Sequence, residues 1–252
     1  MSQSTFNIFL MDIIKLNAIP STNDYLKELA VTNTLNDFTI VVAEVQTKGK
    51  GQMGAVWQVE ASTNLTFSVL VGYGLLSIDD IFTVNVSIAN AIHKVLLSFG
   101  LKDVFVKWPN DIMSCNKKIG GILIENSLKS NGEIQSIIGI GINVNQTNFD
   151  GLPQASSILK ANGIIVDKQD LMIKIVEVFK DVILNLDSNK KHEWDYYHQN
   201  LFKKNIPVTF EIKEGLKFTG MIKDVNQLGQ LGVLNEAGEL IYFNLKEIKM
   251  LY

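Results

Sequence analysis

The sequence has 252 residues, of which 46% are hydrophobic and 19% charged, and its formal net charge is −3. This composition is typical of a globular protein with one or two domains, and the negative charge disfavours DNA or RNA as the main ligand. The single cysteine, Cys115, excludes an internal disulfide and favours a reducing compartment, so we expect a cytoplasmic protein. We recognise no signal peptide and no apolar run of about 18 residues, so no membrane span is expected.

The first half of the chain alternates between strand and helix patterns. Residues 8–19 are apolar and β-branched and predict a strand, which Pro20 ends. The following Ser-Thr-Asn-Asp, residues 21–24, predicts a helix start, because hydroxyl and amide side chains cap helix N-termini. The next predicted elements are a strand over 39–46, a glycine-rich loop over 47–57, a strand over 65–73 and a long helix over 78–99 that Gly100 ends.

The second half begins with strand patterns and ends in a tail of different character. Strands are predicted over 104–108, 112–113, 118–125 and 134–145, with turns at Asn116 and Asn131-Gly132. A polar loop over 148–157 and helices over 168–186 and 191–202 follow. From Ile206 the chain shows short strands separated by glycines, which indicates a small β-barrel. We therefore expect two domains, over residues 1–204 and 205–252.

The glycine-rich loop contains the run Gly49-Lys50-Gly51-Gln52-Met53-Gly54 directly after a predicted strand. A dinucleotide-binding loop would open a helix, whereas the residues that follow here have a β pattern, so that motif is disfavoured. The backbone N–H groups of such a loop can surround an anion, and Lys50 adds a positive charge. A plain surface loop is an equally weighted interpretation of this segment alone.

Three further segments combine polar side chains with strands. Asn110 and Asp111 in KWPND offer the oxygen ligands that Mg²⁺ prefers, although Pro-Asn-Asp also suits a β-turn. In KKIGGILIE, Gly120 and Gly121 allow close approach of a ligand and Lys118 can reach it; a β-bulge beside a solvated lysine is the alternative. The amides of Asn143 and Asn145 face one side of a predicted strand, toward a ligand or solvent.

Taken together and in this order, these segments resemble the biotin–protein ligase family. The resemblance rests on QTKGKGQMGAVW from Gln46, on the unbroken block KWPNDIMSCNKKIGGILIE from Lys107, on GINVN from Gly141, on Ser21-Thr22-Asn23, and on ASSI from Ala155, where the family has Thr in place of Ser156. It implies an α+β fold with a mixed central sheet flanked by helices, like that of class II synthetases, and a small SH3-like C-terminal barrel. Because little sequence precedes Ile13, we expect the short form without the N-terminal DNA-binding domain.

The resemblance also implies an activity. Family members use ATP and Mg²⁺ to activate biotin as biotinyl-5'-AMP and then transfer biotin to one lysine of a biotin carboxyl carrier protein, as in acetyl-CoA carboxylase. They often form homodimers. Two alternatives stay open. A lipoate–protein ligase or octanoyl transferase is disfavoured by the KWPND block and the glycine-rich loop, and transfer through a catalytic cysteine by the turn position of Cys115. A non-catalytic biotin- or nucleotide-binding module is disfavoured by Lys107, Asp111 and Lys118.

The matching positions imply a site. The expected catalytic residues are Lys118 and Asp111, and the expected Mg²⁺ ligands are Asn110 and Asp111. The expected biotin-binding residues are Ser21, Thr22, Asn23, Gln46, Gly49, Lys50, Gly51, Gln52, Trp57, Lys118, Gly120 and Gly121. The expected ATP- and adenylate-binding residues are Lys50, Gln52, Met53, Trp57, Asn110, Lys118, Asn143, Asn145 and Ser157. Many relatives carry arginines where this loop has Lys50, Gln52 and Met53, so weaker retention of the adenylate is expected.

Overall fold

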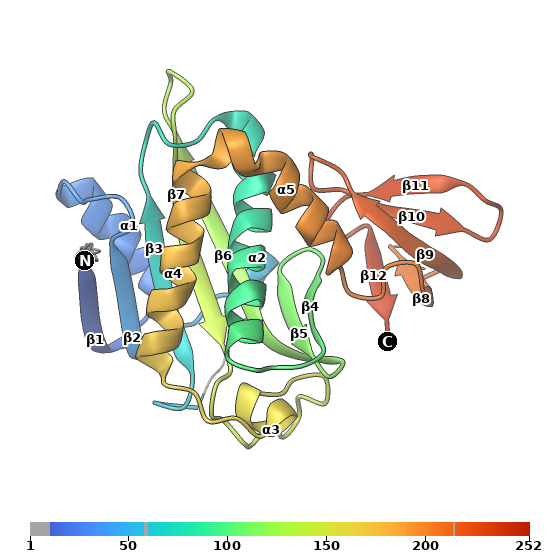
Figure 1. Cartoon of the computed structure of the whole chain (residues 1–252), viewed down its shortest axis with the longest axis horizontal. Coiled ribbons are helices and arrows are strands. Elements are labelled where there is room, and N and C mark those ends of the chain that lie inside the picture. Colours follow the sequence, from blue (N-terminus) through green and yellow to red (C-terminus); the bar gives the residue numbers. More distant parts are fainter. Residues whose placement is uncertain (1–10, 58–59, 214) are drawn as a thin grey trace, which may run out of the picture.

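The computed structural model describes residues 11–57, 60–213 and 215–252. Their largest element is a seven-stranded sheet in the order β1-β2-β3-β7-β6-β5-β4 (Figure 1). β1 and β2 are parallel and the other neighbouring strands are antiparallel, so the predicted mixed sheet is confirmed. The strands are β1 Ile13–Ile19, β2 Ile40–Gln46, β3 Leu65–Val71, β4 Val104–Lys107, β5 Asp111–Ser114, β6 Lys117–Leu128 and β7 Ile134–Ile142.

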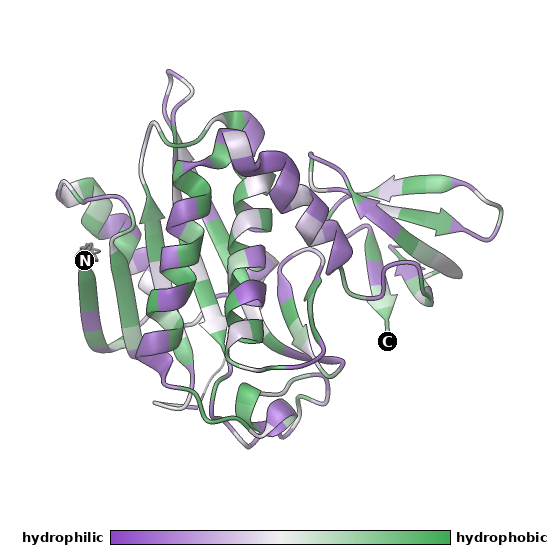
Figure 2. Ribbon diagram, in the orientation of Figure 1, coloured by the Kyte–Doolittle hydropathy of each residue, from purple (hydrophilic) through white to green (hydrophobic). Residues whose placement is uncertain are grey.

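Helices cover both faces of this sheet. The main hydrophobic core lies under α2 Ile81–Ser98, α4 Lys168–Leu184 and α5 Leu186–Gln199, and a smaller core lies under α1 Thr22–Thr32. Successive side chains of β3 point to opposite faces of the sheet, as in any strand. Phe67 and Val69 therefore lie in the main core, whereas Leu70 lies in the core under α1. Figure 2 shows hydrophobic and hydrophilic residues alternating along α4 and a largely hydrophilic α5.

The long helix at the centre of the main core has two parts. A 3₁₀ turn, η2 Ile78–Asp80, leads into α2, and residues 78–98 are apolar and long enough by composition to cross a membrane. However, 72% of its most apolar 18-residue stretch is buried inside the protein, where α2 packs against α4, α5 and β4. The composition of α2 is therefore that of a core helix.

The C-terminal part of the chain forms a second sheet. It has five antiparallel strands in the order β11-β10-β9-β8-β12, and β11 and β12 are its edges within the described residues. Trp108 attaches it to the larger sheet, since its indole Nε1 donates a 2.8 Å hydrogen bond to Gly229 O. The strands are β8 Pro207–Ile212, β9 Lys217–Val225, β10 Leu231–Asn235, β11 Leu240–Phe243 and β12 Ile248–Leu251.

Two predicted element bounds differ clearly from the structure. The strand predicted to reach Asn145 ends at Ile142, because the chain then leaves the ladder and the Asn143 N–H donates to Ile119 O. α5 begins at Leu186, directly after α4, and not at residue 191. Two short elements were not predicted: a 3₁₀ turn, η1 Gln52–Gly54, and α3 Ile158–Asn162. The first residues of the strand predicted over 8–19 lie outside the described part of the chain.

Candidate active site

A cavity of about 230 Å³ lies on the α1 face of the seven-stranded sheet. The start of α1, the end of β2, the glycine-rich loop and the middle of β6 and β7 enclose it. The predicted site residues that line it are Ser21, Thr22, Asn23, Gln46, Lys50, Gly51, Gln52, Trp57, Asn110, Lys118 and Gly121. Segments that are distant in the sequence thus meet around one space.

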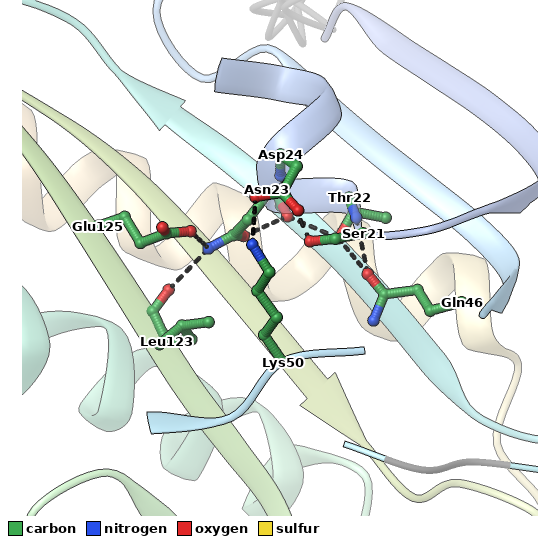
Figure 3. A network of polar contacts seen from close by, with 9 residues as sticks. Ser21, Thr22, Asn23, Asp24, Gln46, Lys50, Leu123 and Glu125 are labelled. Atoms are coloured by element: carbon green, nitrogen blue, oxygen red, sulfur yellow. Dashed lines mark hydrogen bonds and ion pairs between the residues drawn. The ribbon is translucent and has the colours of Figure 1, made fainter. Parts of the chain in front are cut away.

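One side of the cavity is a network of buried polar groups centred on Asn23 (Figure 3). The Asn23 amide donates to Glu125 Oε2 at 2.8 Å and to Leu123 O at 3.3 Å. Its carbonyl oxygen lies 2.6 Å from the Ser68 hydroxyl, which is also 2.7 Å from Thr22 Oγ1. Because the donors and the acceptor of Asn23 are all engaged, its orientation is fixed before any ligand binds.

The first turn of α1 holds Gln46 in place. Ser21 is the N-cap of the helix, and its hydroxyl accepts from the Asp24 N–H at 3.3 Å. The next N–H of the helix, that of Thr22, donates to Gln46 Oε1 at 2.7 Å, and the Thr22 hydroxyl donates to the same oxygen at 3.0 Å. The helix start therefore fixes the Gln46 amide, with its NH₂ group left available as a hydrogen-bond donor at the cavity.

Glycines form the floor of the cavity. Gly121 of β6 and Gly141 of β7 are register partners, and a Cβ on Gly141 would lie 2.4 Å from Trp57 Cε2. A Cβ on Gly139 would lie 2.4 Å from Asn23 Oδ1. Side chains at these positions would displace Trp57 or Asn23, so the flat floor depends on glycine. The Trp57 Nε1–H is buried at this floor without a hydrogen-bond partner among the described residues, which leaves a donor for a ligand.

The glycine-rich loop folds back on itself over the cavity. Gly51 N–H donates to Ala55 O at 2.7 Å, and Trp57 N–H donates to Gly49 O at 3.0 Å. Lys50 reaches from the loop to Asp24 in the first turn of α1, with 2.7 Å between Nζ and Oδ1 (Figure 3). The hydrogen bond that Lys50 donates to the Asp24 carboxylate raises the pKa of Lys50, and both side chains are well exposed. This exposed ion pair is worth only about 0–1 kcal/mol, so Lys50 can be released for another anion.

A charged cluster lies beside Lys118. Lys107 of β4 and Asp111 of β5 are register partners at the turn between their strands, and their Nζ and Oδ2 atoms are 3.0 Å apart. Lys118 Nζ lies 2.5 Å from the other oxygen, Asp111 Oδ1. Burial raises the pKa of the Asp111 carboxyl, but the charges and hydrogen bonds of the two lysines outweigh burial and hold the pKa below its usual value. Asp111 is therefore ionised and bridges two cations.

Asp111 is not arranged as a metal ligand in this conformation, since both of its oxygens are paired with lysines. Asn110 lines the cavity, but its Nδ2 donates to Ile122 O at 2.5 Å. In the part of the chain that the structure describes, no group of three or more His, Cys, Asp or Glu side chains could hold a metal ion. Asp111 thus fits a lysine-bridging role better than direct ligation of Mg²⁺, and Asn110 is bonded to the backbone of β6.

Other predicted residues lie outside the cavity. Asn143 donates to Ser156 O at 3.0 Å, and Ser157 caps α3 and donates to Gln146 O, so both brace the loop over 146–157. Asn145 donates weakly to Val166 O at 3.4 Å and its buried Oδ1 has no described partner. Gly120 lies in β6 against Gly141 O. Gly49 lines an adjoining cavity of about 580 Å³ between the two loops, and the Met53 side chain is not among the described ones.

Three further residues of the site, Ser68, Glu125 and Gly139, were not predicted from the sequence. Glu125 ends the KKIGGILIE segment, and its position two residues after Leu123 was a usable signal, because alternate residues of a strand share a face. Gly139 and Gly141 are likewise two residues apart in an apolar strand. Ser68 carries no comparable signal in a strand of ordinary composition.

The sequence matches a known family model and several characterised proteins. The model of the biotin/lipoate A/B protein ligase family matches residues 16–143. The bifunctional ligase/repressor BirA of Bacillus spizizenii is 30% identical over 194 residues, which are 73% of this chain and 59% of that protein. The biotin–[acetyl-CoA-carboxylase] ligase of Mycobacterium tuberculosis is 27% identical over 238 residues, which are 88% of this chain and 85% of that protein. The chain spans between half and three fifths of the BirA relatives it matches.

A solved structure shares the whole fold. The biotin protein ligase from Aquifex aeolicus, in complex with biotin and ATP, superposes with a TM-score of 0.79, and the match covers 96% of this chain and 99% of that one. The two sequences are 23% identical. The likeness therefore extends over both sheets, including the C-terminal one.

Proposed function

The chain belongs to the biotin/lipoate A/B protein ligase family, and we propose that it is a biotin–[acetyl-CoA-carboxylase] ligase. In this proposal it joins biotin to ATP as biotinyl-5'-AMP and transfers biotin to a specific lysine of a biotin carboxyl carrier domain. One observation carries the proposal: the same cavity is lined by a fixed polar network and by Lys118, which is paired with Asp111. A ligand with a hydrogen-bonding ring and a carboxylate tail matches this arrangement.

The polar network suits the ureido ring of biotin, which has N–H donors and a carbonyl acceptor. Asn23, Thr22 and Gln46 hold one another in fixed orientations, so they are preorganised for such a ring. The glycine floor and the face of Trp57 provide the flat apolar surface along which the rest of biotin would lie. We assign the biotin site to these residues together with Ser21, Gly121 and the loop residues Gly49 to Gln52.

The first reaction brings two anions together. A carboxylate oxygen of biotin attacks the α-phosphorus of ATP, the bond from that phosphorus to the bridging oxygen breaks, and pyrophosphate leaves with the electron pair. Lys118 lines the cavity beside Gly121 and Trp57, and we assign it to contact both the carboxylate and the α-phosphate. Such electrostatic stabilisation is usually the largest contribution to a step of this kind. Asp111 fixes Lys118 in position for it.

In the second reaction, the amine of the carrier lysine attacks the carbonyl of the mixed anhydride, and AMP leaves. The attacking amine must be neutral and must lose a proton as the amide bond forms. Both oxygens of Asp111 are paired with lysines and its pKa is held low, so we assign the proton to water and Asp111 to holding Lys118 in position. The loops over 47–57 and 146–157 would close over the adenylate and exclude water.

Mg²⁺ enters this proposal only as the companion of the ATP phosphates. When bound there it neutralises phosphate charge, as it does in other phosphoryl-transfer sites. We assign the nucleotide side to Lys50, Gln52, Trp57, Asn110 and Lys118. The other residues predicted to bind the nucleotide are assigned only a supporting role in the two loops. They are Met53, Asn143, Asn145 and Ser157.

The main competing substrate is lipoate, whose apolar ring would offer no acceptor to the Gln46 NH₂ group or to the buried Trp57 Nε1–H, at a cost of about 1–3 kcal/mol for each buried group left unpaired. Cys115 gives no support to transfer through a thioester, since it lies in the β5–β6 turn and outside the cavity. Incubation with ATP labelled at the α-phosphate and either biotin or lipoate tests the proposal. A labelled adenylate with biotin alone supports it, an adenylate with lipoate alone refutes it, and none with either would indicate a binding module.

Three further assignments belong to the same proposal. Residues 1–204 would form the catalytic domain and residues 205–252 a C-terminal domain, since each part has its own sheet. A homodimer would form through β1, which is an edge of the seven-stranded sheet and pairs with β2 alone among the described strands. The cytoplasm, where ATP and carboxylases occur together, would be its location, with Cys115 as a free thiol.

A further inference from the structure

Tyr252 of the C-terminal part of the chain lies beside the charged cluster of the candidate active site. It directly follows β12, and the centroid of its ring is 5.3 Å from Lys107 Nζ. Both residues line a cavity of about 530 Å³ between the two sheets, which Trp108 also lines. In Figure 1 the C-terminal sheet lies beside β4 and β5, at the edge of the seven-stranded sheet.

Several contacts hold Tyr252 in this position. Its ring meets the ring of Phe202 edge to face, with centroids 5.4 Å apart and planes at 72°. Its carbonyl oxygen accepts a 3.1 Å hydrogen bond from Gln154 Nε2. Burial raises the pKa of the Tyr252 phenol, and the negative charge of Asp111 raises it further, so the phenol is neutral and close enough to Asp111 to sense its charge.

Gln154 connects the same residue to Lys118. The main-chain oxygen of Gln154 accepts the Lys118 N–H at 2.8 Å, and Ser156 N–H donates to Lys118 O at 2.9 Å. The loop over 146–157 is thus paired along the backbone of Lys118 and tied by a side chain to Tyr252. Tyr252 therefore contacts one lysine of the cluster through its ring and reaches the backbone of the other through Gln154.

We propose that Tyr252 is a positioning residue, which holds Lys107 against Asp111 and thereby sets the position and charge balance of Lys118. The inference rests on the proposed function and adds a residue of the C-terminal sheet to its first step. The face of an aromatic ring attracts an ammonium group and replaces part of its hydration. Lys107 and Asp111 are each about one-seventh exposed, with 16% and 14% of their side-chain surface accessible, so this contact acts in a partly dry environment.

The loss of the ring has a defined consequence for Lys118. Without it, Lys107 gains water and freedom to rotate away, and Asp111 loses one of its two cations. The full negative charge of Asp111 then acts on Lys118 at 2.5 Å and competes with the carboxylate and phosphate that Lys118 must stabilise. The chemical step should slow, whereas the polar network that binds the biotin ring should be unaffected.

The test measures adenylate formation by Tyr252→Leu and Tyr252→Phe at saturating ATP and biotin. Tyr252→Leu should lower kcat about tenfold, the factor that matches a cation–π contact of moderate strength, with the KM for biotin unchanged within about twofold. Tyr252→Phe keeps the ring and should restore kcat to within about twofold of the wild type. Tyr242→Leu is the matched control, because Tyr242 lies on the exposed strand β11 and its hydroxyl contacts Asp224 of the same sheet.

A double variant separates positioning from a general loosening of the fold. In a Lys107→Met background, Tyr252→Leu should cause no further loss of kcat, because its effect passes through Lys107. Additive losses would overturn the inference. Tyr252→Met also removes the ring and should show the same loss of kcat as Tyr252→Leu. It serves as a second test if Tyr252→Leu does not fold.

The outcomes also distinguish the two levels of proposal. A wild-type protein that makes no biotinyl-adenylate would refute the proposed function itself. A wild-type protein that makes it, together with a Tyr252→Leu variant of unchanged kcat, would refute the positioning role alone.

Discussion

Lys118 and Asp111 meet across β5 and β6, with 2.5 Å between the ammonium nitrogen and one carboxylate oxygen. The other oxygen of the same carboxylate is 3.0 Å from Lys107 Nζ, so one anion holds two cations at the edge of the cavity. Lys118 is also 5.8 Å from the centroid of the Trp57 ring, which belongs to the glycine-rich loop. These contacts fix the ammonium group before substrates bind, and such preorganisation is what an electrostatic stabiliser requires.

Lys118→Ala should lower the rate of adenylate formation by roughly a hundredfold or more, since it removes the cation that would face the reacting carboxylate and phosphate. The fold should change little, because Asp111 keeps its ion pair with Lys107. Lys117→Ala is the matched control: its ammonium donates to Pro153 O, away from the cavity, so its rate should equal that of the wild type. Pyrophosphate release measures both, and a wild-type rate in Lys118→Ala would show that the assignment is wrong.

Gly139→Ala should weaken biotin binding by about tenfold or more. The new Cβ would lie 2.4 Å from Asn23 Oδ1, so Asn23 must move and lose its contacts with Ser68 and Glu125. Breaking a buried hydrogen-bond network of this kind typically costs about 1–3 kcal/mol. Isothermal titration with biotin measures the change.

A double variant checks the cause of that change. In Asn23→Ala/Gly139→Ala the clash is absent but the network is also absent, so the melting temperature should recover relative to Gly139→Ala while biotin binding stays weak. If the double variant regains wild-type affinity, Asn23 does not contribute to the biotin site. If Gly139→Ala alone binds biotin normally, the network tolerates the displacement and the site is elsewhere.

Local patterns in the sequence predicted the elements of the fold well. Ser21 has the side chain and position of an N-cap, and it caps α1 as expected. Gly100 and Gly132 were predicted to end a helix and to form a hairpin turn, and both have positive φ. Such features depend on a few neighbouring residues, so they can be read along the chain.

Contacts between residues that are far apart in the sequence could not be predicted. Asn143 and Asn145 have the composition of ligand-binding residues, but the chain bends after Ile142 and their amides turn to the loops. Tyr252 and Lys107 are far apart in the sequence and meet only because the C-terminal sheet docks on the turn that holds Trp108. No local pattern predicts that docking, since it depends on the packing of two separate sheets.

His93 should make the stability of the protein depend on pH. It is buried between α2, α5 and β4, where Nε2 donates to Val104 O at 3.0 Å and Nδ1 lies 2.8 Å from Tyr196 Oη. Burial lowers the pKa of His93 below its ordinary value of 6.5, and the charge of Lys94 lowers it further. The unfolded chain therefore takes up a proton at a higher pH than the folded one, so stability is complete above pH 6.5 and decreases as the pH falls below it.

Urea denaturation between about pH 7.5 and about pH 5.5 measures this effect through the free energy of unfolding. His93→Gln retains an amide donor for Val104 O but has no proton to gain, so its stability should depend less on pH over this range. Equal slopes for the wild type and the variant would show that His93 does not titrate differently in the two states.

Gln52→Arg should lengthen the time for which the adenylate stays bound. Gln52 lines the cavity at the start of η1, and the loop cation Lys50 is paired with Asp24 at the opposite, α1 side. A well-formed contact between a charged donor and a phosphate is worth about 1.5–3 kcal/mol, so one added contact should slow dissociation by roughly tenfold or more. Stopped-flow fluorescence of Trp57 and Trp108 measures the off-rate, and biotinylation of albumin as a bystander should fall with it.

Gln52→Met, which changes the side chain without adding charge, serves as the control. If Lys50 leaves Asp24 and already supplies the contact, the arginine variant will have an unchanged off-rate, and weak retention of the adenylate is then not a property of this loop.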